Sequence, residues 1–161
     1  MDTTTKHWYA IKFHTSRAKS IKILLEQQGL ESFFPTQYIR SLAFIHTTET
    51  TITHIRNTQN TLMWVYSSPL TRKPLTIPDR EMELFMFVVT TGDKGLLYLG
   101  DDKPEYHIGN RVRVIKGPFT GAEGHIKRIK KDRRLIVTIQ GVAAIATTFI
   151  HPDCLEPVAN N

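Results

Sequence analysis

The chain has 161 residues, of which 40% are hydrophobic and 22% charged, a composition typical of a globular protein with one or two domains. The longest apolar run, 84–89, is too short to span a membrane, and residues 1–6 lack the apolar segment of a secretory signal. A single cysteine, Cys154, excludes an intramolecular disulfide, so we expect a cytoplasmic protein without membrane contact.

The net charge of +6 is unevenly distributed, with +3 in residues 1–91, −2 in 92–105 and +5 in 106–161. This pattern suggests an acidic linker between two basic halves. Basic surfaces favour polyanionic partners, but they also serve solubility alone, and charge leaves these two interpretations open.

The first half alternates between strand and helix patterns. Strands are predicted at 8–13, at 33–38, where Pro35 indicates an edge or bulge, at 42–46 and at 62–66. A helix capped by Thr15 or Ser16 ends at Gly29, a second covers 47–56, and a third begins at Pro78. Its apolar stripe is Met82, Phe85, Met86 and Val89. This order predicts one sheet with helices packed on a face.

The second half is dominated by short strand patterns after a stretch, 92–105, that is predicted to be a linker. Five strands are expected, at 111–116, 124–130, 135–139, 143–149 and 154–157. Five short strands in so few residues predict a small barrel, because closure removes exposed sheet edges.

Catalytic and metal-binding patterns are missing from the sequence. The seven histidines have no metal-ligand spacing, and neither a nucleophile elbow nor a phosphate-binding loop is present. We therefore expect no enzyme activity, no metal and no cofactor.

Residues 108–114, 116–121 and 123–124 resemble a KOW motif, whose glycines suit tight corners between strands. KOW motifs occur in ribosomal proteins and in transcription-elongation factors of the NusG/Spt5 type, so the motif alone leaves both open. Residues 6–11, 34–36, 42–45 and 74–82 resemble the NusG N-terminal (NGN) domain. Together, the two resemblances cover almost the whole chain in the family's order.

The NusG resemblance implies an α+β fold in two parts. Residues 1–91 form an NGN domain with a four-stranded, mostly antiparallel sheet and helices, 92–105 a linker, and 106–161 a five-stranded SH3-like KOW β-barrel. Only Ile39, Arg40 and Ser41 separate the second and central strands, where the family has a hairpin or loop. That loop is therefore either absent or missing from the sequence.

The resemblance also implies a function, that of a monomeric transcription elongation and antitermination factor which binds the clamp helices of RNA polymerase. The sequence looks closer to the specialised paralogues for long polysaccharide operons than to general NusG. A ribosome-associated KOW-type RNA-binding protein is the alternative. In the family, the KOW part holds a ribosomal protein or another factor. Gln140 stands where general NusG has an aromatic residue, which predicts weak or no Rho binding.

Three sets of candidate site residues follow from the resemblance. The polymerase-binding candidates, which could equally fill the core, are Trp8, Lys12, Leu42, Phe44 and Trp64. The candidates for upstream or non-template DNA, which could equally form a solvated helix face, are His14, Arg17, Lys19 and Lys22. The candidates for a KOW partner are Phe119, Ile139, Gln140, Gly141 and Val142. The basic run 127–134 fits either RNA or ribosomal contact, or solubility.

Overall fold

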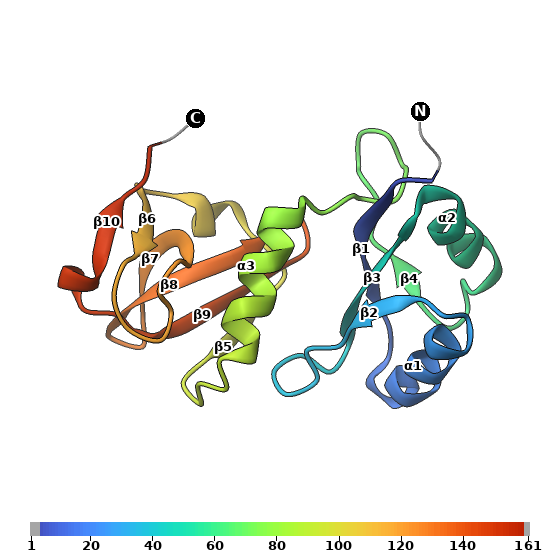
Figure 1. Cartoon of the computed structure of the whole chain (residues 1–161), viewed down its shortest axis with the longest axis horizontal. Helices are drawn as coiled ribbons and strands as arrows, with labels where there is room; N and C mark the ends of the chain where they lie inside the picture. The colour runs from blue at the N-terminus through green and yellow to red at the C-terminus, as the bar shows by residue number, and fades with distance from the viewer. Residues whose placement is uncertain (1–3, 160–161) are drawn as a thin grey trace. The chain divides into compact units, whose positions relative to one another are not determined.

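The computed structural model describes residues 4–159, so the first three residues of the segment considered for a secretory signal lie outside the described part. Contacts divide the chain into two compact units, Met1–Asp79 and Arg80–Asn161 (Figure 1). None of the helices in the described range is both long and apolar enough to cross a membrane. The fold class is confirmed as a mixed α/β unit followed by a strand-rich unit.

The first unit is a four-stranded antiparallel sheet of order β2-β3-β1-β4 with two helices. Its elements are β1 (Lys6–Lys12), α1 (Ala18–Gln27), β2 (Glu31–Phe33), β3 (Leu42–Thr48), α2 (Glu49–Thr58) and β4 (Trp64–Val65). Both helices cover the same face of the sheet (Figure 1). The apolar core between them contains Tyr9, Ile11, Phe13, Ile21, Leu25, Ala43, Ile45, Ile52, Ile55, Met63 and Val65.

The start of α1 differs from the sequence prediction, whereas its end agrees. A 3-10 turn, Thr15–Arg17, precedes it and is capped by His14, so the predicted capping by Thr15 or Ser16 is wrong. At the other end, Gly29 has φ of +68°, and its N–H donates to the Glu26 carbonyl at 3.0 Å. Glycine fits this left-handed end because it has no Cβ.

The second strand is shorter than predicted and lies earlier in the chain. β2 ends at Phe33, and the following residues form a turn in which the Ile39 N–H donates to the Pro35 carbonyl at 2.8 Å. The chain then passes directly to β3, with the Phe13 N–H donating to the Ser41 carbonyl at 3.0 Å. No hairpin intervenes between β2 and β3 in the described chain.

The boundaries of two further elements differ from the predicted ones by a few residues. β3 continues to Thr48, whose hydroxyl accepts from the Thr51 N–H at 3.2 Å, so α2 begins at Glu49 rather than at residue 47. β4 is reduced to two residues because the Met63 N–H is bound to the Gln59 carbonyl at 3.1 Å in the preceding turn.

The second unit is a six-stranded antiparallel sheet of order β10-β6-β7-β8-β9-β5. Its elements are β5 (Leu97–Gly100), β6 (Arg111–Val114), β7 (Glu123–Ile129), β8 (Asp132–Ile139), β9 (Ala143–Phe149) and β10 (Leu155–Pro157). By its contacts, α3 (Asp79–Thr90) is grouped with this unit from Arg80 onward. Within its predicted stripe, Met82, Phe85 and Val89 are buried.

Five strands of the second unit lie close to their predicted places, and β5 is additional. β5 comes from the stretch expected to be a linker and pairs with β9. Leu97 and Leu99 are partly buried against a small cluster that includes Tyr106 and Ile136. Burial of these leucines explains why Leu97–Gly100 is a strand, although the surrounding residues are acidic and rich in glycine.

Close backbone approach between β7 and β8 requires glycine at position 124. A Cβ built on Gly124 would lie 2.1 Å from the Ile136 carbonyl oxygen. This distance is too short for any side chain at position 124. The glycine that opens the second strand of the KOW-like pattern is therefore needed for strand pairing.

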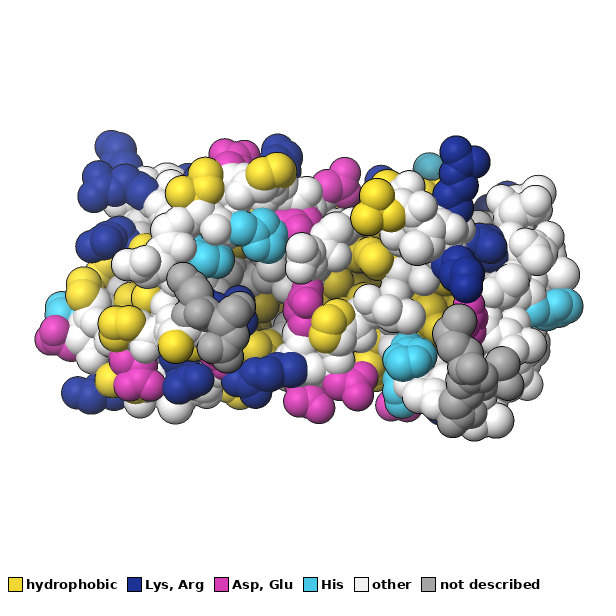
Figure 2. Space-filling view, turned by 90° about the horizontal axis from the view of Figure 1, so that it is seen from above, with side chains coloured by type: hydrophobic (Ala, Val, Ile, Leu, Met, Phe, Trp, Pro, Cys, Tyr) yellow, Lys and Arg dark blue, Asp and Glu magenta, His cyan; other side chains and the backbone are white. Residues whose placement is uncertain are grey.

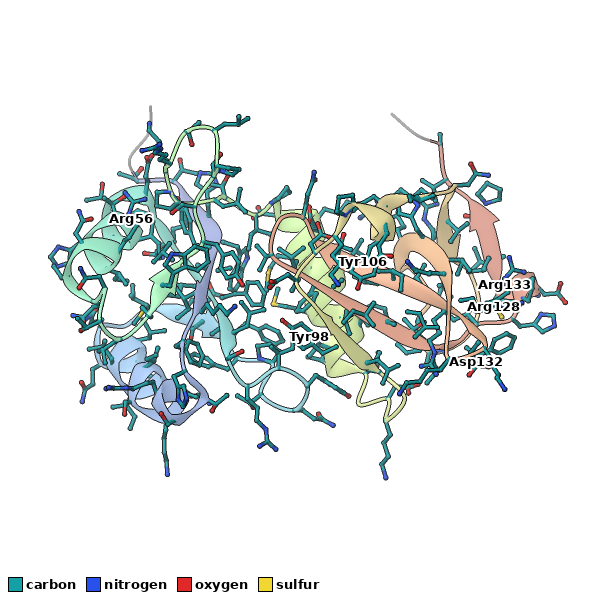
Figure 3. All side chains as sticks on the ribbon, turned by 180° about the vertical axis from the view of Figure 1, so that it is seen from behind. Arg56, Tyr98, Tyr106, Arg128, Asp132 and Arg133 are labelled. Carbon is teal, nitrogen blue, oxygen red and sulfur yellow. The ribbon has the colours of Figure 1, made fainter. Side chains whose placement is uncertain are left out.

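The β7–β8 hairpin ends in a turn at Lys130 and Lys131, whose φ angles are 52° and 74°. Figure 2 shows Lys and Arg side chains gathered at this end of the second unit, at the left of the view. Arg128, Asp132 and Arg133 lie together there in Figure 3. The basic run seen in the sequence is therefore concentrated at one hairpin.

Candidate functional site

The five candidate polymerase-binding side chains share one face of the sheet in the first unit. The register pairs them as Trp8↔His46, Ala10↔Phe44, Lys12↔Leu42 and Lys12↔Trp64. Directly opposed residues of antiparallel strands point to the same side, and alternate residues along a strand do so as well. This face is opposite the one covered by α1 and α2, because Tyr9 and Ile11 lie in the helix-facing core.

Aromatic rings are concentrated on this face. The Trp8 and His46 rings stack with centroids 4.9 Å apart, and the Phe33 and Phe44 centroids are 6.4 Å apart. We refer to Trp8, Phe33, Phe44, His46 and Trp64 as the aromatic face. Phe33 was not among the predicted site residues because its strand was expected to begin there and run to residue 38, whereas β2 ends at Phe33. His46 was not among them either, although it alternates with Phe44 along β3.

Exposure differs sharply among these residues. The exposed fraction is 56% for Trp64 but only 7% for Trp8, 2% for Leu42 and 0% for Phe44. Lys12 is also exposed. Trp64 and Lys12 are therefore the candidates that reach solvent directly, whereas Phe44 and Leu42 are packed side chains.

The four candidate DNA-binding residues lie on α1 and the turn before it, and all four are exposed. The His14 ring is 2.8 Å from the Ser16 hydroxyl, and the Lys22 ammonium lies 6.0 Å from the centroid of the Phe34 ring. Arg17 and Lys19 have no side-chain partner among residues 4–159. Their charges are therefore free to meet phosphate.

The candidate KOW partner loop divides into buried and exposed residues. Phe119, Ile139 and Val142 are at most 3% exposed and belong to the core, whereas Gln140 and Gly141 are exposed. Both exposed residues use their backbone N–H groups in contacts with residues far away in the chain, and the Gln140 N–H donates to the Glu81 carboxylate. The Gly141 N–H donates to Asp102 Oδ2 at 3.0 Å. Burial raises the pKa of the Glu81 carboxyl, although the Gln140 hydrogen bond opposes this rise.

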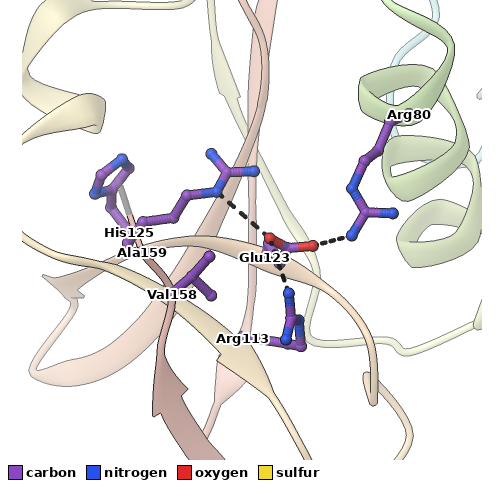
Figure 4. Close-up of a pocket in the computed structure, with 7 residues that line it drawn as sticks. Arg80, Arg113, Glu123, His125, Val158 and Ala159 are labelled. Atoms are coloured by element: carbon purple, nitrogen blue, oxygen red, sulfur yellow. Dashed lines mark hydrogen bonds and ion pairs between the residues drawn. The ribbon is translucent and has the colours of Figure 1, made fainter. Parts of the chain in front are cut away.

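A carboxylate with three surrounding arginines lies elsewhere in the second unit and was not selected from the sequence (Figure 4). Glu123 accepts a hydrogen bond from Arg80, and its Oε1 lies 3.6 Å from Arg111 Nε and 3.7 Å from Arg113 Nη2. Burial alone would raise the pKa of Glu123, but the hydrogen bond and the three positive charges hold it below its ordinary value. An open cavity of about 650 Å³ adjoins this cluster. Sequence reasoning had no signal for it, because Arg80 and Glu123 are distant in the chain.

Metal-ligand geometry is not found within residues 4–159, where no group of three or more His, Cys, Asp or Glu side chains is placed to hold a metal ion.

Two family models match the sequence. The model described as "Transcription termination factor nusG" matches residues 6–86, and the KOW motif matches residues 108–140. A search of curated proteins gives no match.

One of two similar solved structures supports the fold. The structure described as "Domain interaction in Thermotoga maritima NusG" has a TM-score of 0.52 and 17% identity, covering 96% of this chain and 98% of that one. The structure described as "Crystal Structure of MjSpt4:Spt5 complex conformation A" matches with a TM-score of 0.34 and 12% identity over 96% of this chain and 99% of that one, a score too low to support a shared fold. Because the NusG model covers half of the sequence, with the KOW motif following it, the chain belongs to the NusG family of transcription elongation factors.

Proposed function

We propose that this protein binds the clamp helices of RNA polymerase through the aromatic face and Lys12, and that it suppresses pausing and termination. The observation that supports this function is the gathering of Trp8, Lys12, Leu42, Phe44 and Trp64 on one face of the sheet. Large aromatic side chains with a nearby cation are typical of interface anchors.

The proposed mechanism is mechanical. A factor that bridges the polymerase clamp to the far side of the DNA channel holds the clamp closed, provided that it binds the closed state more tightly than the open one. NusG-family factors are generally regulators rather than enzymes, and this mechanism requires no catalytic residue.

Nucleic acid supplies a second contact in this proposal. His14, Arg17, Lys19 and Lys22 face upstream or non-template DNA, where the exposed arginine and lysines neutralise phosphate charge. This contact orients the factor on the polymerase and carries no sequence information by itself.

The second unit gives the protein its specialised role in this proposal. Gln140 is exposed at the turn between β8 and β9, where an aromatic side chain would anchor Rho. A factor that does not recruit Rho suits the protection of long transcripts. Its KOW unit would instead hold a ribosomal protein or another factor.

The direct test is binding of the full chain to core RNA polymerase with Trp64→Ala. Because Trp64 is 56% exposed, this change leaves the fold intact, and loss of an anchor weakens binding on the order of thirtyfold. Ile23→Ala is a matched control, since Ile23 is 48% exposed on α1 and lies on the other side of the sheet. Equal affinity of the Trp64 variant and the control would contradict the proposed face.

A further inference from the structure

The cavity beside Glu123 contains more cations than its carboxylates neutralise. The residues that line it all belong to the second unit, and they are Arg80, Arg111, Arg113, Glu123, His125, Val158 and Ala159. Glu156 on β10 pairs with Arg113 at 3.3 Å, so two carboxylates face three guanidinium groups, and these arginines form no other ion pair within residues 4–159. Burial lowers the pKa of His125, so its ring adds no charge at neutral pH. One positive charge therefore has no ion-pair partner of its own.

Arg111 is the cation whose hydrogen bonds are missing. Its Nε lies 3.6 Å from Glu123 Oε1, which suits an ion pair but is longer than a hydrogen bond. Arg80 donates to Glu123 and Arg113 donates to Glu156, whereas the Arg111 guanidinium donates to no acceptor in the described part of the chain. A guanidinium has five N–H donors in one plane. Those of Arg111 are available to an acceptor that enters the cavity.

The pairing of β6 with β7 holds the cluster in place before any ligand binds. Arg111 is opposite His125 and Arg113 is opposite Glu123, so the four side chains share one face of the sheet. Figure 4 shows Arg80 and Arg113 approaching Glu123 from different sides. The Glu123 side chain is only 5% exposed and contacts all three arginines, so it orients them together. Donors that are already oriented lose less entropy when a ligand binds.

We propose that this cavity binds a phosphoryl group, either of inorganic phosphate or of a small organic phosphate, with Arg111 as the main donor and Arg80 and Arg113 beside it. The planar guanidinium matches phosphate in a two-bond arrangement. A phosphoryl group has three acceptor oxygens and about two negative charges, whereas a carboxylate has two oxygens and one charge. It can therefore accept from more than one arginine and neutralise the excess charge.

The volume of the cavity leaves space for more than the phosphoryl group. The open cavity is about 650 Å³, and Val158 and Ala159 are its apolar lining residues. An organic group attached to the phosphate would contact these two side chains. The site goes beyond the proposed function, because neither the polymerase contact nor the Rho prediction uses these residues.

The test is calorimetric titration of the full chain with inorganic phosphate, phenyl phosphate and succinate at about 0.15 M salt, where exposed charges are screened. Both phosphates should bind at one site, and succinate, a dicarboxylate, should bind at least about tenfold more weakly. Tighter binding of phenyl phosphate identifies an organic phosphate as the ligand, and equal or tighter binding of inorganic phosphate identifies the free ion. Succinate binding as tight as phosphate binding would overturn the proposal, and so would the absence of saturable binding.

Substitution of arginine by lysine separates a built site from simple charge attraction. Arg111→Lys keeps the charge but loses the planar donor pattern, so phosphate affinity should fall about tenfold or more. Arg80→Lys, at a side chain that is 66% exposed, should also weaken binding and is a second variant that leaves folding intact. Arg128→Lys makes the same exchange at an exposed position outside the cavity and serves as the control. Urea unfolding checks that all three variants are folded.

Two results with these variants would contradict the proposal. If Arg111→Lys and Arg80→Lys bind phosphate as tightly as the control does, charge alone explains the binding. If an oligonucleotide without a terminal phosphate displaces phenyl phosphate at a lower concentration than inorganic phosphate does, the cluster follows a nucleic-acid backbone and is not a site for a small phosphate.

Discussion

Glu123 is a nearly buried carboxylate surrounded by three arginines. Its side chain is 5% exposed, whereas the side chains of Arg80, Arg111 and Arg113 are 66%, 40% and 41% exposed. The arginines therefore retain access to water, and the carboxylate depends on them to remain ionised. Because its pKa is lowered in the folded chain, the stabilisation it provides is fully present above the ordinary pKa that the carboxyl has in the unfolded chain. That stabilisation is lost as the pH falls through the folded pKa.

We predict that Glu123→Gln lowers the free energy of unfolding by about 1–3 kcal/mol at neutral pH, because charged hydrogen bonds are lost. At acidic pH, below the folded pKa of Glu123, the variant and the original chain should converge. Urea unfolding at the two pH values measures both differences. A stability difference that does not depend on pH would show that Glu123 contributes through packing and not through its charge.

Gln140 leads to a prediction about Rho. Placing an amide in an apolar pocket without partners costs about 1–3 kcal/mol, and the lost aromatic burial adds about 1.5–3 kcal/mol. Rho affinity should therefore be lower than that of an aromatic-bearing turn by on the order of a hundredfold or more. Titration of the chain and of Gln140→Phe with Rho checks this, and the variant should bind more tightly. Tight binding by the unchanged chain would remove the main support for an antiterminator role.

At the scale of elements, alternation and glycine positions predicted most strands and the end of α1. The sequence pattern failed at β2, where Pro35 lies in a turn rather than within an edge strand. It failed again at β5, where acidic residues and glycines obscured two leucines that pair with and pack on the sheet. The error at β5 arises because tertiary burial overrides local composition, whereas the error at β2 arises because Pro35 begins a turn.

The candidate site was also predictable only in part. Alternation in the segments of β1 and β3 identified which side chains share a face, and the register places them together. Exposure was not predictable, because Phe44 on one face and Ile11 on the other are both fully buried. A strand that is apolar on both sides carries no signal that distinguishes core from interface.

The cations of α1 lead to a salt-dependence prediction. If Arg17 and Lys22 each contact a phosphate of a single strand, replacing both with Gln should flatten the salt slope of factor binding by about 1.4. The measurement uses a polymerase–nucleic-acid scaffold over a salt series. Arg40→Gln with Lys73→Gln is the control, since both residues are exposed and lie outside α1. An unchanged slope would leave these residues as a solvated helix face.

At the scale of the whole molecule, the two units have separate cores and carry separate candidate surfaces. Surface changes in one unit should therefore leave the stability of the other unaffected. Polymerase binding and binding of other partners can then be removed independently, because sites that share no side-chain partners contribute additively.

We predict that saturating protein increases read-through at pauses and terminators in a reconstituted transcription assay. Trp64→Ala should abolish most of the increase at the same concentration, because the factor no longer occupies polymerase. Gln140→Phe, measured without Rho, should retain it. Identical read-through with and without the protein would instead favour a ribosome-associated role.

Because Trp8 and Trp64 differ in exposure, tryptophan fluorescence can report on what binds to the aromatic face. The chain has two tryptophans, both on this face, and they are 7% and 56% exposed. A water-soluble quencher of fluorescence should reach Trp64 and spare Trp8, so emission from the free protein resolves into a shielded and an accessible component. A small molecule or peptide without tryptophan that covers the face would shift Trp64 emission to the blue and protect it from quenching. Ligands for this surface can therefore be screened without any label on the protein.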